Sequence, residues 1–119
     1  MVQALIDTGL DCNTISNKIF ETLDDVALQP TNAILRLFTT HTTKPRGICN
    51  LVVYVDELSC GDKFFVTQSD LQDVYVILGR AWQKKYNCFF NWKNNLVHCQ
   101  SADHGLWVPL QCQDKGTTK

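Results

Sequence analysis

The chain has 119 residues and a balanced charge, with 11 basic and 12 acidic side chains and a formal net charge of −1. A chain of this length forms one domain and buries about two-thirds of its unfolded surface. The hydrophobic fraction of 45% is typical of a globular core and excludes a disordered polypeptide. Lysine and arginine do not cluster, so no nucleic-acid partner is expected. We expect a globular domain over 1–112 and a disordered tail over 113–119.

The first half of the chain alternates short apolar segments with polar turns, which is typical of a protein built from short strands. One helix is predicted over Asn17–Leu23, because its apolar residues recur at helical spacing behind a capping Ser16 or Asn17. The segment Thr39–Gly47 is polar and ends in turn formers, which predicts an exposed hairpin tip or loop. Strands are predicted over Val2–Ile6, Asn13–Ser16, Ala33–Thr39 and Ile48–Val55.

The second half predicts more short strands and one short helix over Gly79–Tyr86. A turn is expected at Cys60-Gly61-Asp62, and a second turn at Lys93-Asn94-Asn95, where asparagine tolerates a positive φ. This count of strands indicates an all-β fold, a small closed β-barrel with one short C-terminal helix. The remaining predicted strands are Lys63–Thr67, Val74–Leu78, Cys88–Trp92, Leu96–Cys99 and Gly105–Leu110.

The longest apolar runs have the length of a strand and cannot cross a bilayer, so no membrane partner is expected. The sequence opens without the charged and apolar regions of a secretory signal, which predicts a cytoplasmic location. The six cysteines are therefore expected to be reduced and mostly buried. A zinc site is a weaker alternative, because the Cys-x-x-Cys spacing of structural zinc is missing and adjacent strand residues point to opposite faces. Its candidate ligands are Cys88, His98, Cys99 and His104, and our prediction is no metal and no cofactor.

Two motifs some seventy residues apart carry the chemistry: Ala4-Leu5-Ile6-Asp7-Thr8-Gly9 and Val76-Ile77-Leu78-Gly79-Arg80. A carboxylate that activates water needs a shifted pKa, which the end of a buried strand and a neighbouring acid can provide. The Thr8 hydroxyl can fix the loop, and Gly9 lets the backbone turn without a Cβ clash. Asp7 is therefore the candidate catalytic residue, although a turn aspartate without chemistry fits the tripeptide alone.

The chain resembles the retropepsin-like aspartic proteases of retroviruses and LTR retrotransposons, most closely the gypsy-type and plant retroelement branch. The resemblance covers nearly the whole chain and implies an aspartic endopeptidase that cleaves a polyprotein. It further implies a homodimer in which each copy supplies one Asp7, because two adjacent carboxyls share one proton and act as base and acid. It depends on the two motifs above, on Asn13-Thr14-Ile15-Ser16, and on Gly79-Arg80-Ala81-Trp82 followed by the Cys88-to-Cys99 hairpin.

The resemblance also assigns roles to the neighbours of Asp7. Thr8 and Gly9 support the active-site loop, and Gly9 and Asp11 contact the substrate backbone, with Arg80 supporting Asp11. For Asp11 and Arg80, an exposed ion pair of little energetic value is an equally good interpretation. The segment Thr39–Gly47 takes the place of the flap, the hairpin that closes over the substrate. Its named residues are Thr40, His41, Thr42 and Thr43.

A second hypothesis keeps the fold and removes the turnover: a catalytically inactive module that binds a peptide or dimerises. It is motivated by Leu10, which stands where the family usually has alanine or serine, and by a flap without glycine pairs. The C-terminal strand around Trp107 and Val108 is a candidate part of a dimer interface.

Overall fold

A computed structural model of the chain describes residues 4–37, 41–68 and 76–110. These residues are mostly in short strands, which confirms the all-β class, and the two helices among them have four and six residues. The predicted tail at 113–119 and the flap residue Thr40 lie outside the described residues. The elements are β1 (Ala4–Ile6), β2 (Thr14–Ser16), α1 (Asn17–Phe20), β3 (Leu35–Leu37), β4 (His41–Thr43), β5 (Gly47–Val55), β6 (Leu58–Thr67), β7 (Val76–Leu78), α2 (Arg80–Lys85), β8 (Phe89–Asn91), β9 (Leu96–Ser101) and β10 (His104–Pro109).

The largest sheet brings the two sequence motifs together. Its strand order is β1-β7-β2-β6-β5, so β7 lies between β1, which begins the first motif, and β2, which follows that motif. β7 runs parallel to β1, with Ile6 opposite Leu78, and antiparallel to β2. Because parallel strands end at the same edge of a sheet, Asp7 and Gly79 follow their strands side by side.

The β5–β6 hairpin corrects one predicted turn. Cys60-Gly61-Asp62 lies inside β6, and the chain reverses at Asp56 and Glu57, with Val55 opposite Leu58. Asp56 adopts a φ of 52°, a left-handed conformation that aspartate tolerates better than most residues. The β5–β6 hairpin, which is longer than one that turns at Gly61, is favoured because alternate side chains of β6 then face the core. The buried side chains at these positions are Leu58, Cys60, Phe64 and Val66.

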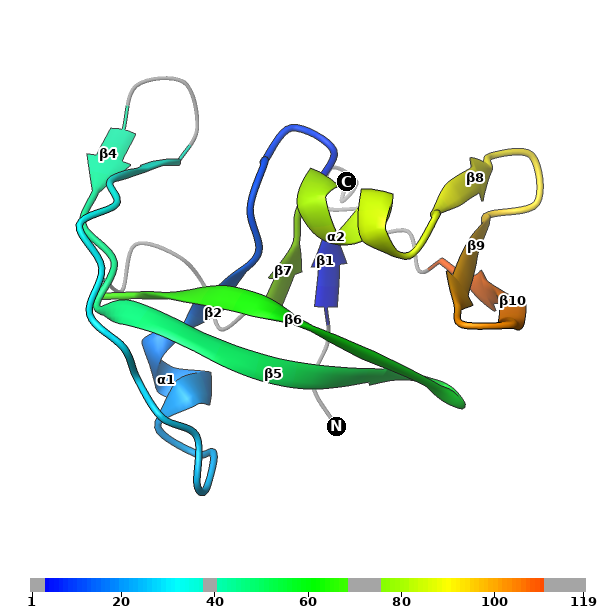
Figure 1. Ribbon diagram of the computed structural model, residues 1–119. Helices are drawn as coiled ribbons and strands as arrows, with labels where there is room; N and C mark the ends of the chain where they lie inside the picture. The colour runs from blue at the N-terminus through cyan, green and yellow to red at the C-terminus, as the bar shows by residue number, and fades with distance from the viewer. Residues whose placement is uncertain (1–3, 38–40, 69–75, 111–119) are drawn as a thin grey trace.

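Two smaller sheets lie at opposite ends of the β5–β6 hairpin (Figure 1). One is the hairpin β3–β4, and the other has the order β10-β9-β8. The predicted turn before β9 is confirmed, and Asn95 there has a φ of 55°. Within the described part of the chain none of the three sheets closes on itself, so the closed barrel is not seen.

Both helices form inside their predicted ranges, but α1 ends at Phe20 and is shorter than the predicted Asn17–Leu23. The Ser16 hydroxyl accepts a hydrogen bond from the Ile19 amide at 3.3 Å and so caps α1, as expected. The helix α2 begins after Gly79 and buries Trp82, whose side chain is 1% exposed. Trp82 joins the core between the helices and the sheets, together with Ile15, Phe64, Val66, Val97 and Cys99.

Candidate functional site

Asp7 lies in the loop that follows β1, at an edge accessible to solvent. Its amide donates to the Leu78 carbonyl at 3.1 Å, which extends the pairing of β1 with β7 by one residue. Its carboxylate Oδ1 accepts a hydrogen bond from the Gly9 amide at 2.8 Å, and the side chain is half-buried while Thr8 and Gly9 are exposed. The loop thus fixes the carboxylate by a local bond and leaves it reachable from outside.

Gly79 is packed against the loop so closely that only glycine fits. A Cβ at this position would overlap the Cys12 carbonyl oxygen and come within 2.7 Å of the Leu10 carbonyl oxygen. The Gly79 amide also donates to Asn13 Oδ1 at 3.0 Å. The second motif therefore needs its glycine because the loop backbone approaches the start of α2 at this point.

Asp11 and Arg80 form the predicted pair. The Arg80 guanidinium contacts Asp11 Oδ1, and the side chains are 59% and 80% exposed, respectively. Two backbone bonds support the contact: the Arg80 amide donates to Leu10 O at 2.7 Å, and the Ala81 amide donates to Asp11 O at 2.9 Å. Such an exposed pair stabilises the fold by at most about 1 kcal/mol, so the backbone bonds contribute more to the loop's position.

Gln83 is a site residue that sequence reasoning missed. It is 9% exposed, and its side-chain amide donates to the Asp7 carbonyl at 3.2 Å and to the Leu78 carbonyl at 3.1 Å. One side chain of α2 therefore joins the ends of both motif strands. The only sequence signal was a polar residue directly after Trp82 in a helix with a buried face.

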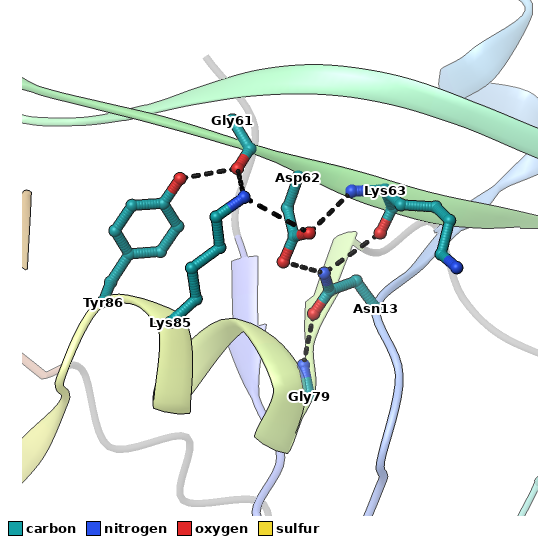
Figure 2. A network of polar contacts seen from close by, with 7 residues as sticks. All are labelled: Asn13, Gly61, Asp62, Lys63, Gly79, Lys85 and Tyr86. Carbon is teal, nitrogen blue, oxygen red and sulfur yellow. Dashed lines mark hydrogen bonds and ion pairs between the residues drawn. The ribbon is translucent and has the colours of Figure 1, made fainter.

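Asn13 is the second missed residue, and Figure 2 shows that it bridges α2 and β6. It is 2% exposed, accepts the Gly79 amide, and donates to Asp62 Oδ2 at 2.9 Å and to the Lys63 carbonyl at 3.1 Å. Its own carbonyl accepts the Phe65 amide at 3.0 Å. A buried amide with this many partners fixes the loop after Asp7 onto the central sheet.

The Gly61 carbonyl is the second centre of the network in Figure 2. It accepts hydrogen bonds from Lys85 Nζ at 2.9 Å and from the Tyr86 hydroxyl at 2.5 Å. Lys85 Nζ also lies 3.8 Å from Asp62 Oδ1. Burial raises the pKa of Tyr86 above its ordinary value, which keeps the hydroxyl protonated as a donor.

The predicted flap is partly strand. β4 pairs antiparallel with β3, placing Thr42 opposite Arg36 and Thr43 opposite Leu35. His41 is paired opposite Leu37, and Gly47 already belongs to β5. The pairing excludes an unpaired loop at His41–Thr43 and fits a hairpin, which was the other predicted alternative, whereas Thr39 and Thr40 lie outside the described residues.

The four candidate zinc ligands do not converge on one point, although the sulfur atoms of Cys88 and Cys99 lie 3.6 Å apart. Cys99 faces the core, whereas His98 stacks on Phe89 with ring centroids 4.6 Å apart on the outer face of the three-stranded sheet. Across residues 4–37, 41–68 and 76–110, no group of three or more His, Cys, Asp or Glu side chains is placed to hold a metal ion. The five cysteines described there have free thiols, and Cys49, Cys60 and Cys99 are buried, as predicted.

A shallow groove of about 550 Å³ lies away from Asp7, between the β5–β6 hairpin and α2. Its lining includes Leu51, Lys63 and Tyr86.

No family model matches the chain, and a search of curated proteins finds no match. Among the residues that the structure describes, no helix is both long and apolar enough to cross a membrane.

Proposed function

We propose that this chain is half of a homodimeric aspartic endopeptidase in which the Asp7 carboxyls of two copies activate a water molecule. The observation that carries the proposal is the meeting of the two motifs at the ends of β1 and β7. There the Asp7 amide bonds to Leu78, and Gly79 packs on the loop that follows Asp7. The resemblance to retropepsin-like proteases supports the same assignment.

The local geometry suits a carboxylate that must keep one orientation. The Asp7 backbone is held at its amide by Leu78 and at its carbonyl by Gln83, so the residue has little freedom to swing. Oδ1 is occupied by the Gly9 amide. Among the described residues Oδ2 has no hydrogen-bond partner, which leaves it available to a second carboxyl, to water or to the substrate carbonyl.

The chemistry requires two carboxyls, and this motif supplies one in each chain. Two carboxyls about 3 Å apart cannot both ionise, so the pair holds one proton. The ionised member accepts a proton from water, and the protonated member donates to the peptide carbonyl as the tetrahedral adduct forms.

The proposed substrate is an extended segment of a polyprotein. An extended chain can pair with strand edges, and the hairpin β3–β4 offers an edge that can cover the substrate. Asp11 carries an 80% exposed carboxylate beside the loop, where it can accept a substrate amide while Arg80 holds it. Thr8 supports the loop, and Gly9 exposes backbone to the substrate.

The small closed barrel is part of the same proposal. The Ser101 hydroxyl in β9 donates to the Ser59 carbonyl in β6 at 3.1 Å, which connects the three-stranded sheet to the central sheet. Such contacts between sheets are what a small barrel needs at its seams.

Asp7→Asn tests the proposal, because the amide keeps the shape of the side chain and cannot take up the proton. We expect cleavage of unstructured peptides at acidic pH to fall by at least about a hundredfold. Asp103→Asn is the matched control, since it removes an exposed carboxylate from a distant turn. Thermal unfolding of both variants should match that of the wild type. Undiminished, pepstatin-insensitive proteolysis in Asp7→Asn would refute the assignment.

A peptide-binding module without turnover is the second candidate, favoured by the edge strand β5. Val52 and Tyr54 on this strand are 54% and 73% exposed, and β5 is the last strand of its sheet. Gln29 pairs with this strand at Ile48, and the rest of the edge, beside Val52 and Tyr54, can accept an extended peptide as an added strand. Wild-type protein that binds such peptides and never cleaves them would favour this function.

A further inference from the structure

Cys88 and Cys99 lie side by side behind the three-stranded sheet. Their sulfur atoms are 3.6 Å apart. Phe89 and His98 are directly opposite each other in the antiparallel β8–β9 pairing. The next pair of opposed residues along this hairpin is therefore Cys88 and Cys99. Opposed strand residues have Cβ atoms about 4.5–5.5 Å apart, close to the separation of about 3.5–4.5 Å that a disulfide needs.

We propose that Cys88 and Cys99 are a thiol–disulfide exchange site that forms a reversible intramolecular disulfide with low-molecular-weight disulfides as oxidants. This inference does not depend on the proposed peptidase function. Its basis is the 3.6 Å contact between the two sulfur atoms, the only such contact between thiols among the described residues, although Cys60 also lies near Cys99 in the core. Cys12 lies in the loop after Asp7, and Cys49 is paired opposite Phe64 in the β5–β6 hairpin.

The solvent exposure of the two thiols determines which of them reacts first. Cys88 is half-buried, whereas Cys99 is 1% exposed, so a reagent in solution reaches Cys88 first. The Cys88 thiolate attacks one sulfur of the small disulfide, forming a mixed disulfide and releasing one thiol. Cys99 then attacks the Cys88 sulfur and releases the second thiol. Two protein thiols and one small disulfide thus become one protein disulfide and two small thiols, and the two protons leave with those thiols.

The hydrogen bond between the thiols sets the pH dependence. The contact with Cys99, followed by burial, raises the pKa of Cys88, and the same bond lowers the pKa of Cys99. The pair shares a proton that must be lost before Cys88 can attack. The rate of the exchange therefore rises as the pH increases from 7 to 9.

The disulfide would lock the hairpin that follows α2. It closes a loop of about a dozen residues, which constrains the unfolded chain. The Cys88 amide donates to the Gln83 carbonyl at 2.8 Å. One end of the disulfide is therefore hydrogen-bonded to Gln83, whose side chain donates to the Asp7 carbonyl. Oxidation is expected to raise the Tm by about 10 °C.

Oxidation of the full chain by oxidised glutathione, followed by alkylation of free thiols and mass mapping, tests the proposal. Trypsin cleaves after Lys85 and Lys93, so the disulfide joins two peptides that separate after reduction. Because Cys112 shares a tryptic peptide with Cys99, the Cys99→Ser variant identifies the partner. We expect the cross-link in the wild type and in the control Cys12→Ser. We expect it to be lost in Cys99→Ser, which keeps glutathione on Cys88.

Three results would overturn the inference. The first is wild-type protein that retains glutathione on Cys88 without closing a disulfide. The second is a cross-link from Cys60 to Cys99, since the Cys60 thiol also lies near Cys99 in the core. The third is a Cys88–Cys99 bond that lowers the Tm, because such a bond would have formed in an unfolded chain and not in this hairpin.

Discussion

Replacing Gly79 by alanine tests whether the two motifs depend on each other. The new methyl group would overlap the Cys12 carbonyl and come within 2.7 Å of the Leu10 carbonyl, and neither backbone group can rotate away. The loop after Asp7 must therefore separate from the start of α2. Three hydrogen bonds cross this boundary: Gly79 to Asn13, Arg80 to Leu10 and Ala81 to Asp11.

The expected loss of stability follows from these contacts. Forcing a methyl group into a filled site costs about 1–3 kcal/mol. Each hydrogen bond stretched at the boundary adds about 1 kcal/mol when its partners are left poorly paired. We therefore expect Gly79→Ala to lower the free energy of unfolding by about 4 kcal/mol, a large share of the roughly 5–15 kcal/mol of a typical domain. The Tm should fall by about 15 °C.

Urea unfolding followed by tryptophan fluorescence measures this loss, and Gly61→Ala is the matched control. A Cβ at Gly61 would lie 3.8 Å from the Leu51 carbonyl oxygen and from Val52, which is ordinary contact. Alanine also loses less chain entropy than glycine, so Gly61→Ala should be neutral or stabilise by up to about 1 kcal/mol. Equal stability of Gly79→Ala and Gly61→Ala would refute the close packing of the loop on α2.

Two further predictions concern buried polar groups. Gln83→Met keeps the side-chain volume and removes the donor to the Asp7 and Leu78 carbonyls, so the free energy of unfolding should fall by about 1–3 kcal/mol. The exposed control Gln100→Met should change it by less than about 0.5 kcal/mol, and equal effects would contradict the bridging role. Burial raises the pKa of Cys49, so its contribution to stability is complete below about pH 8.5 and is lost as the pH rises further. The destabilisation by Cys49→Ala, measured by urea unfolding, should therefore shrink between pH 8 and pH 10, and a constant difference would contradict the assignment.

Local signals in the sequence predicted much of the fold. The capped helix after Ser16 and the turn at Asn95 formed where their short-range chemistry indicated. The turn at Cys60-Gly61-Asp62 failed because glycine is ambiguous: it permits a turn, and it also fits inside a strand. Burial of Cys60 and Phe64 on the core face of β6 decided the outcome, and that burial depends on contacts with distant strands.

The parts of the candidate site that lie within the two sequence motifs could be predicted. The polar side chains whose role depends on hydrogen-bond partners far away along the chain could not. Asp11 and Arg80 were paired correctly. The roles of Asn13 and Gln83 depend on carbonyls that are far away along the chain, such as Lys63 O for Asn13 and Asp7 O for Gln83. No spacing rule brings these groups together before the strand order β1-β7-β2-β6 is known.

Mixing of subunits tests most directly the proposal that two chains share one catalytic centre. Wild-type chains are mixed with inactive Asp7→Asn chains at equal amounts and constant total concentration, and peptide cleavage is measured after exchange. If each centre needs Asp7 from both copies, only wild-type pairs cleave, and activity falls to about one quarter of the unmixed wild type. An activity of about one half would mean that each chain acts alone, which contradicts the shared pair of carboxyls.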